Sequence, residues 1–426
     1  MTGDTLWQEI RDQLPALTRV DILVGLPTFN NAATVRSVAQ AVTAGLRQAF
    51  PGSATVLINA DAGSQDGTPE LLKQAIGEQI PTAFFRRQSG GASVGMGALP
   101  RLSESGVPGR EEAFRTFFTA TRQAGASACA VVDPAVRSVT SDWLPWLLGP
   151  VMEGRADYVA PVFLRPRYEG SLTNSLIYPL NRALYGAVVR YHTGGGYGFS
   201  GALAGLYLER DLWEGKAAEY GIESWLTTVA VAEGRPICQA GLGEKIVEPG
   251  RIGEDLSSVL TQAVGSLFHF MERYQDVWEQ RSGSLPVPQV GLPYRPGQDR
   301  APVNVERMIR GFRQGLRDLL PLWEIILSPE TLSGILPLGL TEAEDFRFPA
   351  ALWAQTVYDF ALAYHEKVLH QDHVLKSLTP LYLGWMASLV LRTRDGKPED
   401  VEDAIEELCD TFARTKPYLV ERWRFS

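Results

Sequence analysis

The chain has 426 residues and a mass of 46.8 kDa, and its 45% hydrophobic and 21% charged residues are typical of a folded globular protein. Its 40 basic and 49 acidic residues give a net charge of −9, and no basic block is present that would attract a phosphate backbone, so nucleic acid is not an expected partner. Because a chain of this length exceeds what one hydrophobic core usually fills, we expect two domains.

Neither a signal peptide nor a membrane span is expected. The amino-terminal segment MTGDTLWQEIRDQ is polar, and the longest apolar stretch, LTPLYLGWMASLVL, is too short and too interrupted to cross a bilayer. We therefore expect a cytoplasmic protein without a transmembrane segment. Three widely spaced cysteines show no metal-ligand spacing and are expected to be buried free thiols: Cys129, Cys238 and Cys409.

Two strand, loop and helix units begin the chain. DILVGLPTF predicts a strand that ends at Pro27, after which Asn30 and Asn31 can cap a helix with apolar residues at helical spacing. ATVLINADAGSQDGTPELLKQA repeats the arrangement, with a strand to Ala60 and a helix that begins near Thr68. Three more strands are predicted in TAFFRRQ, AVVD and DYVAPVF. Strands that alternate with helices predict an α/β fold with a mostly parallel, doubly wound sheet covered on both faces.

Two glycine-rich segments interrupt this pattern. Residues 89–110, SGGASVGMGALPRLSESGVPGR, show no periodicity and predict a binding loop or a flexible lid, and residues 193–201 form a second glycine cluster, TGGGYGFSG. Past Gly283 a proline-rich connection leads into an almost wholly helical remainder. We therefore predict domains 1–285 and 286–426, of which the second is helical and either packs over a ligand cleft or forms a homodimer contact.

Polar residues follow three of the predicted strands. They lie in residues 27–31, in residues 61–66 and at Asp133. In open parallel sheets, ligands bind at the carboxyl ends of the strands, where the strand order reverses. Each position also has a purely structural explanation, since Asn30 can cap a helix, and Asp66 and Asp133 can begin turns. Taken together, the three positions favour one shared crevice.

Several motifs resemble glycosyltransferases of the GT-A type, which use nucleotide-diphospho-sugars. LPTFNNAATV and DAGSQDGT resemble the first two strand ends of family 2 and related enzymes, and AVVDPAVRS lies where these enzymes carry an Asp-x-Asp motif. GVPGREEAFRTFF resembles a loop of the retaining glucosyl-3-phosphoglycerate synthases and of their glucosylglycerate and mannosylglycerate relatives. RPRYEGSLTNSLIYPLNRALYG and GGGYGFSGALAG resemble the acceptor region of that group. The resemblance covers roughly residues 20–250.

The resemblance implies a GT-A fold, which is Rossmann-like with a mostly parallel sheet, followed by a helical domain. It also implies transfer of a hexose from a nucleotide-diphospho-sugar to a small acidic acceptor, such as glycerate or 3-phosphoglycerate, with retention of configuration. Mg²⁺ or Mn²⁺ is the implied cofactor. The implied partners are the small-molecule donor and acceptor.

Site residues follow from the positions that match these motifs. Nucleotide-sugar binding is implied for Pro27, Thr28, Asn30, Asp61, Arg110 and Asp133. Among them, Asp61 would hydrogen-bond the base, and Arg110 stands where the family usually has a lysine near the diphosphate. Acceptor binding is implied for Arg167, Tyr168, Thr173, Asn174 and Gly195. Asp133, which is also the implied metal ligand, and Glu223, in GIESW, are the implied catalytic acids.

The metal site of the family is altered in this chain. The second acid of Asp-x-Asp is Ala135, and Gly196 and Val247 stand where relatives carry an aspartate and a histidine. Magnesium can be held by one or two carboxylates and substrate phosphates, so Asp133 alone is expected to form a weak site or none. The leaving diphosphate nevertheless needs a positive charge. Four arginines are candidates to supply it, although each is also explained as a surface or structural residue: Arg110, Arg137, Arg165 and Arg167.

A second interpretation is a protein of this fold that has lost catalysis. Such a protein would bind a nucleotide, another ligand or an active homologue and regulate it, and the altered metal positions raise this alternative. A dinucleotide-binding dehydrogenase is disfavoured, because LPTFNN follows the first strand where a G-x-G-x-x-G turn would be required.

Overall fold

The structure is a computed structural model that describes residues 3–86, 109–192, 194–210, 212–213, 217, 221–247, 255–296 and 303–424. The chain divides into two compact units. The first contains Met1–Leu164, Tyr191–Glu254 and Val287–Tyr294, and the second contains Arg165–Arg190, Asp255–Pro286 and Arg295–Ser426.

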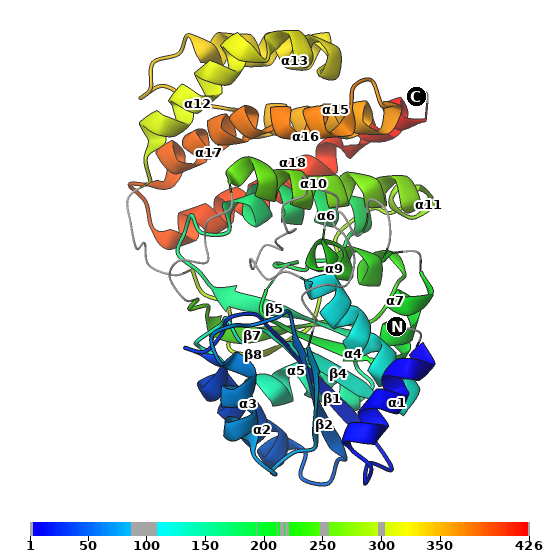
Figure 1. Cartoon of the computed structure of the whole chain (residues 1–426). Helices are drawn as coiled ribbons and strands as arrows, with labels where there is room; N and C mark the ends of the chain where they lie inside the picture. The colour runs from blue at the N-terminus through cyan, green and yellow to red at the C-terminus, as the bar shows by residue number, and fades with distance from the viewer. Residues whose placement is uncertain are drawn as a thin grey trace. The chain divides into compact units, whose positions relative to one another are not determined.

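One mixed sheet forms the centre of the first unit. Within the described residues, eight strands lie in the order β3-β2-β1-β4-β6-β5-β7-β8. Figure 1 labels β1, β2, β4, β5, β7 and β8. Their bounds are β1 Ile22–Thr28, β2 Thr55–Asp61, β3 Thr82–Arg86, β4 Ala128–Val132, β5 Tyr158–Leu164, β6 Gly196–Ser200, β7 Ile237–Glu244 and β8 Gln289–Gly291. Neighbouring strands are parallel except at β6, which runs antiparallel to β4 and β5. This arrangement confirms the α/β fold with a mostly parallel sheet.

Helices cover both faces of the sheet. One face packs against α2 (Val35–Ala49), α3 (Thr68–Ile76) and α5 (Trp143–Met152). The other face packs against α4 (Arg110–Ala124), which contacts α1 (Gly3–Gln13), α7 (Gly201–Glu209) and α9 (Ile222–Ala232). Strands buried on both faces are apolar along their whole length, which explains why the sequence shows uninterrupted apolar runs rather than alternation.

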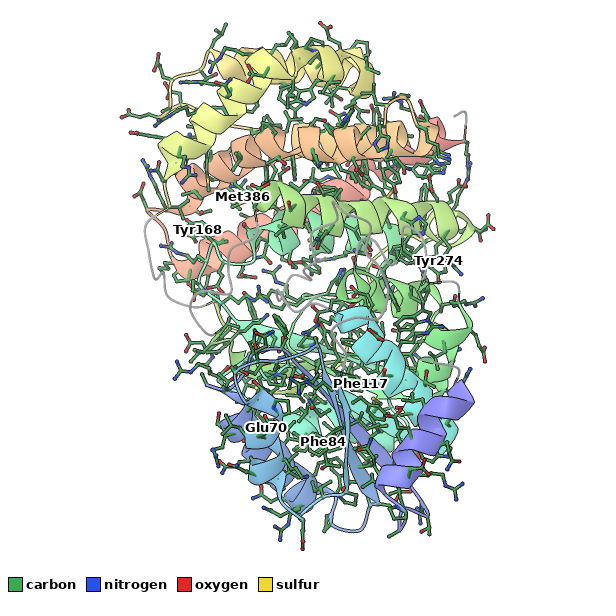
Figure 2. The ribbon with its side chains drawn as sticks, in the orientation of Figure 1. Glu70, Phe84, Phe117, Tyr168, Tyr274 and Met386 are labelled. Atoms are coloured by element: carbon green, nitrogen blue, oxygen red, sulfur yellow. The ribbon has the colours of Figure 1, made fainter. Side chains whose placement is uncertain are left out.

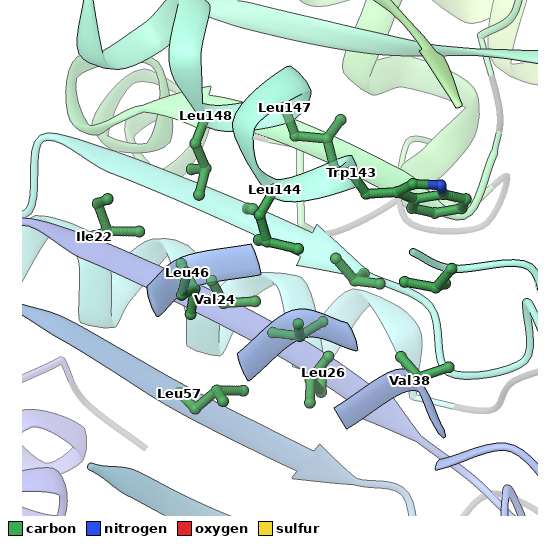
Figure 3. Packing of buried hydrophobic residues seen from close by; sticks show 14 of the residues in the cluster. Ile22, Val24, Leu26, Val38, Leu46, Leu57, Trp143, Leu144, Leu147 and Leu148 are labelled. Atoms are coloured by element: carbon green, nitrogen blue, oxygen red, sulfur yellow. The ribbon is translucent and has the colours of Figure 1, made fainter. Parts of the chain in front are cut away.

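The first strand shows how the two cores divide its side chains. Ile22, Val24 and Leu26 belong to the cluster that includes residues of α2 and α5 (Figure 3). Gly25 lies on the opposite face, where the ring of Phe117 in α4, labelled in Figure 2, packs against it. All seven residues of β1 are buried as a result.

The second unit is helical in its described residues. Its elements are the π-helical turn Thr173–Ile177, α6 Tyr178–Tyr185, α10 Leu256–Arg273, α11 Gln275–Trp278, α12 Val305–Asp318, α13 Leu320–Ile326, α14 Pro329–Ile335, the 3-10 turn Leu336–Gly339, α15 Ala350–Glu366, α16 Gln371–Ser377, α17 Thr379–Thr393 and α18 Pro398–Trp423. In α18 an amphipathic pattern places one apolar stripe against the neighbouring helices α6 and α15. That stripe is buried, and it includes Val401, Ala404, Ile405, Leu408 and Phe412.

The boundaries of the two compact units differ from those of the predicted domains 1–285 and 286–426. Residues 165–190 and 255–286 belong to the second unit, because α6 packs on α18 and α10 packs on α15 and α16. Whether the chain folds as two independent domains at the predicted boundary stays a prediction. Most of the glycine-rich loop predicted at residues 89–110 lies outside the described residues.

Three smaller expectations can be compared with the structure. The three cysteines are free and buried, as predicted. The second glycine cluster forms β6 over most of its length, a strand that the sequence did not predict. Among the described residues, one stretch, Gln371–Thr393, is long and apolar enough to cross a membrane, and 72% of its most apolar segment is buried inside the structure.

Candidate functional site

The loop that follows β2 is held by the carboxylate of Asp61. Its Oδ1 atom accepts hydrogen bonds from the hydroxyls of Thr28, at 2.9 Å, and Ser64, at 2.5 Å. Its Oδ2 atom accepts from the backbone N–H groups of Gly63 and Ser64 at 3.1 and 2.9 Å. Asn59 also donates to the Thr28 hydroxyl at 2.9 Å. The four acceptor positions of Asp61 are therefore used within the chain, which fixes the ends of β1 and β2 to each other.

The loops after β1 and β2 are joined by a second set of hydrogen bonds. The N–H of Asn30 donates to Ser64 Oγ at 2.9 Å, and Asn30 Oδ1 accepts from the N–H of Gln65 at 3.0 Å. Asp66 accepts from the hydroxyl and the N–H of Thr68 at 2.6 and 3.1 Å. Burial raises the pKa of Asp66, but the hydrogen bonds from Thr68 and from the backbone N–H of Ala32 together outweigh this effect and lower the pKa below its usual value.

The helix cap expected at Asn30 and Asn31 is wrong. Helix α2 begins at Val35, and Thr34, at the N-cap position before it, makes no capping hydrogen bond through its side chain. Asn30 instead has a positive φ of 51° and bridges the two loops. Asn31 closes a local turn, because its Oδ1 atom accepts from the N–H of Phe29 at 2.7 Å. The polar sequence after β1 therefore builds the loop rather than the helix start.

A buried guanidinium lies between the two acids that the sequence assigns to catalysis. Arg110 Nη1 is 3.0 Å from Asp133 Oδ2, and Arg110 Nη2 is 2.8 Å from Glu223 Oε1. The side chains of the three residues are 0%, 3% and 5% exposed. The hydroxyl of Tyr197 donates to the same Glu223 oxygen at 2.8 Å and accepts from the N–H of Gly194 at 2.7 Å. Residues from α4, β6, α9 and the end of β4 thus meet in one cluster.

Asp133 occupies its place because β4 ends at Val132 and the chain turns directly afterwards. Its Oδ1 atom accepts from the N–H of Ala135 at 2.8 Å, which is the turn that the structural explanation predicted. Its own N–H donates to the carbonyl of Gly195 at 2.7 Å. The other carboxylate oxygen is the one that faces Arg110. Asp133 is therefore both a turn residue and an ion-pair partner.

Electrostatics keep Arg110 charged and Tyr197 protonated. Burial lowers the pKa of Arg110, but Glu223 and Asp133 more than compensate and raise the pKa above its usual value. Burial and the nearby Glu223 carboxylate raise the pKa of Tyr197 well above its usual value. Its hydroxyl therefore stays protonated and donates a hydrogen bond to Glu223. One guanidinium therefore faces two carboxylates in a site from which water is largely excluded.

A cleft of about 140 Å³ opens beside this cluster. It lies at the carboxyl ends of β1 and β2, and its lining includes four of the predicted nucleotide-sugar residues: Pro27, Thr28, Asp61 and Arg110. Asp133 is not part of the lining but contacts Arg110 directly. The structure therefore places the ends of β1 and β2 in one cleft, and Asp133, at the end of β4, in contact with Arg110 rather than in the lining.

Arg86, the last residue of β3, also lines this cleft and was missed in the sequence. It donates to the carbonyl of Ser64 at 2.7 Å, and its Nε atom lies 3.7 Å from Asp61 Oδ2. Its side chain is 59% exposed, so its charge is available to a ligand in the cleft. The signal that could have found it is its position at the end of the third parallel strand.

Two predicted acceptor residues make contacts inside the second unit. Arg167 Nη1 donates to the carbonyls of Gly396 and Thr393, at 3.0 and 3.3 Å. The hydroxyl of Tyr168 lies 2.9 Å from Thr393 Oγ1. These bonds tie the segment before α6 to the end of α17. They give both residues a structural role, and acceptor binding stays a prediction.

The other predicted acceptor residues belong to different compact units. Thr173 and Asn174 begin the π-helical turn of the second unit and are buried. Asn174 Oδ1 is buried without a hydrogen-bond partner among the described residues. Gly195 belongs to the first unit, where its carbonyl accepts from Asp133.

The residues present do not fit the divalent cation that the resemblance implies. Ala135 and Val247 supply no ligand atom through their side chains, and Val247 pairs with Val136 in a β-bridge. A Cβ atom at Gly196 would lie 3.1 Å from the ring of Trp143, so this position faces the core. Among the described residues, no group of three or more histidines, cysteines, aspartates or glutamates could hold a metal ion.

Comparisons with known proteins gave structural matches alone. No family model matches the chain. No curated protein matches it either. Solved structures with a partly similar fold include glucosyl-3-phosphoglycerate synthase from Mycobacterium tuberculosis in complex with Mn²⁺, uridine diphosphate and phosphoglyceric acid, at 22% identity and a TM-score of 0.43, covering 64% of this chain and 82% of that chain.

Mannosyl-3-phosphoglycerate synthase from Rubrobacter xylanophilus is similar to the same degree. It shows 19% identity and a TM-score of 0.43, covering 66% of this chain and 82% of that chain. A likeness at this level carries no functional conclusion. The function must be argued from the residues of this chain.

Proposed function

We propose that the first unit is a GT-A glycosyltransferase domain that binds a nucleotide-diphospho-sugar in the cleft at the ends of β1 and β2. The observation that supports this proposal is that Pro27, Thr28, Asp61 and Arg110 line one cleft. These residues come from three segments that are far apart in the sequence and that separately resemble donor-binding motifs. An accidental resemblance would not require the three segments to converge.

The cleft contains two arginines beside the acids Glu9, Asp61 and Glu112. The side chain of Arg86 is 59% exposed and can bind phosphate oxygens through paired N–H groups, whereas both Nη atoms of the buried Arg110 are paired with acids. A unit charge pair at about 4 Å is worth roughly 4 kcal/mol at an effective dielectric constant of about 20. That energy corresponds to nearly three decades of rate if it develops only in the transition state.

We propose transfer of a hexose with retention of configuration to a small acidic acceptor such as glycerate or 3-phosphoglycerate. In a retaining transfer the leaving phosphate takes the acceptor proton, so no protein base is needed. This suits a site in which the oxygens of Asp133 accept hydrogen bonds from Arg110 and Ala135, because a carboxylate bound in this way is poorly placed to accept a proton. The acceptor residues remain those implied by the sequence.

Transfer is tested with radiolabelled UDP-, GDP- and ADP-hexoses and either glycerate or 3-phosphoglycerate. We expect a glycosylated acid with at least one donor, and a loss of about tenfold in kcat/KM for Arg86→Gln, because one positive charge at the cleft is removed. Arg115→Gln, an exposed change on α4, is the matched control and should leave the rate unchanged. Failure of all three nucleotides to bind would contradict the proposal.

The Arg110 cluster also favours the second candidate function. Arg110 already pairs with both acids of the cluster. This arrangement also suits a nucleotide-binding regulator without catalysis. The two candidates differ in one observable. Calorimetric binding of a nucleotide-sugar that is neither hydrolysed nor transferred over long incubation would select the regulator.

A further inference from the structure

We infer that the guanidinium of Arg110 takes the place of a divalent cation in this site, so that a nucleoside diphosphate binds without metal. The part of this inference that concerns nucleotides rests on the proposed function. The part that concerns the cation rests on the Arg110 cluster alone.

The first step is the position of the positive charge. Arg110 contacts Asp133 and Glu223, acids that lie 23 and 113 residues further along the chain, at 3.0 and 2.8 Å. A single cation that binds carboxylates from distant segments is the arrangement expected of a bound metal ion. Here the chain itself supplies that cation from the first residue of α4.

The second step is that the ion pairs leave the acids unavailable to a metal. Asp133 accepts from Arg110 through Oδ2 and from the N–H of Ala135 through Oδ1. Glu223 Oε1 accepts from both Arg110 and the hydroxyl of Tyr197. A metal ion that entered would have to displace the buried guanidinium from both carboxylates. Displacing one partner of a buried pair is strongly unfavourable.

The third step is that the cation adjoins the ligand cleft, although its side chain is 0% exposed. Arg110 lines the cleft together with Pro27 and Asp61. Its Nε atom is buried and has no hydrogen-bond partner among the described residues, although its two Nη atoms are paired with carboxylates. A guanidinium carries five N–H donors in a fixed plane. Arg110 can therefore hold the acids and still donate to a phosphate oxygen.

The cation replacement is tested by titrating the protein with Mn²⁺ alone and following free Mn²⁺ by electron paramagnetic resonance. We expect no Mn²⁺ site at the cluster in the natural chain. Arg110→Ala should gain one, because two buried carboxylates are left without a counter-charge, and Arg110→Ala/Asp133→Asn should lose it again. Arg86→Gln removes a positive charge from the same cleft without freeing Asp133, so it is the matched control and should gain no site.

Two results of this titration would overturn the inference. One is Mn²⁺ binding by the natural chain that Asp133→Asn abolishes. The other is a folded Arg110→Ala variant, judged by circular dichroism, that binds no Mn²⁺. If Arg110→Ala does not fold, Arg110→Lys, which keeps one positive charge, takes the place of the alanine variant in the same titration. Lysine is a point charge that cannot bridge both acids as a guanidinium does, so a weaker gain of Mn²⁺ binding is expected and its absence counts against the inference.

Metal independence is tested separately by calorimetry with UDP, GDP and ADP on the natural chain. We expect the Kd of the bound nucleotide to be the same in EDTA and in MnCl₂. A tightening of about tenfold by Mn²⁺ would overturn the inference. If no nucleotide binds in either buffer, the proposed function fails, and the Mn²⁺ titration still decides whether Arg110 replaces the metal.

Discussion

A guanidinium and a divalent cation can hold the same carboxylates, with different charge and geometry. A metal ion exchanges with solvent and depends on its concentration, whereas Arg110 is covalently part of the chain and stays charged at every accessible pH. The planar group also fixes the directions in which Asp133 and Glu223 are held. The substitutions at the metal positions of the family can therefore be understood as one coordinated change, in which ligands are lost where they are no longer needed.

Removing Arg110 should be much more damaging than a surface substitution. Arg110→Gln leaves two carboxylates buried without a counter-charge, and breaking a buried ion pair in this way costs about 3–5 kcal/mol of the free energy of unfolding. The measurement is the midpoint of urea unfolding at pH 7. Arg115→Gln, on the exposed side of the same helix, should change the free energy by less than about 0.5 kcal/mol.

A second variant separates lost charge balance from lost packing. In Arg110→Met/Asp133→Asn/Glu223→Gln no member of the cluster is charged, so most of the stability lost in Arg110→Gln should return. If the triple variant unfolds as early as Arg110→Gln, the cost comes from the shape of the arginine side chain and not from its charge. Equal midpoints for Arg110→Gln and the natural chain would contradict the prediction outright.

At the scale of elements, the glycines of β6 explain both a missed strand and a close contact. The sequence GGGYGFSG suggests a flexible segment, because glycine lowers strand propensity. In the structure, a Cβ atom at Gly198 would lie 2.1 Å from the carbonyl oxygen of Leu147 in α5. Glycine is therefore required where the helix backbone approaches the strand. The same strand places Tyr197 and Phe199 on the face that packs against α4.

Gly198→Ala should consequently destabilise the first unit. The added methyl group meets backbone rather than a side chain that can move, and overpacking of this kind costs about 3 kcal/mol. Thermal unfolding followed by circular dichroism provides the measurement. Gly52→Ala is the control, because nothing lies within 4 Å of a Cβ at that position, and its midpoint should match the natural chain. A Gly198→Ala midpoint equal to that of Gly52→Ala would show that α5 can move away freely.

The elements that the sequence predicted share one property, which is a long local pattern. Strands β1 to β5 are predicted because each contains an apolar run bounded by turn residues, and α18 belongs to the carboxyl-terminal part that is predicted to be helical. The Arg110–Glu223 pair could not be predicted, because its partners are 113 residues apart and no spacing rule links them. Asp133 was found because it ends a strand, but its ion pair depends on how α4 and α9 pack.

At the scale of the whole molecule, the buried titratable groups set how stability changes at alkaline pH. Burial raises the pKa values of Tyr158, Tyr185 and Tyr358 above their usual value, and it raises those of Cys129 and Cys409 to about 12. The unfolded chain loses these protons first as pH rises, so the folded state binds more protons and stability falls above about pH 9. A buried lysine acts in the opposite direction.

Lys416 of α18 should contribute a stability that increases with pH. Burial, with a smaller contribution from Arg281, lowers the pKa of Lys416 from 10.5 to about 8. Its Nζ atom donates to the carbonyls of Leu184 and Arg281 at 3.2 and 2.7 Å. Between about pH 8 and pH 10.5 the unfolded chain binds more protons at this site than the folded chain, so the free energy of unfolding rises across that window.

The contribution of Lys416 is isolated by comparing variants, because the tyrosines and cysteines titrate in all of them. The free energy of unfolding of the natural chain minus that of Lys416→Met should rise by about 1 kcal/mol from pH 8 to pH 10, since solvent screening reduces the full effect of the pKa shift. Lys416→Arg keeps a donor for the two carbonyls but stays charged throughout, so the same difference should appear against it. A difference that is flat or falls with pH would mean that Lys416 is not held in a site that favours its neutral form. Because the comparison uses slopes and not absolute stabilities, the hydrogen bonds that each variant loses do not affect its outcome.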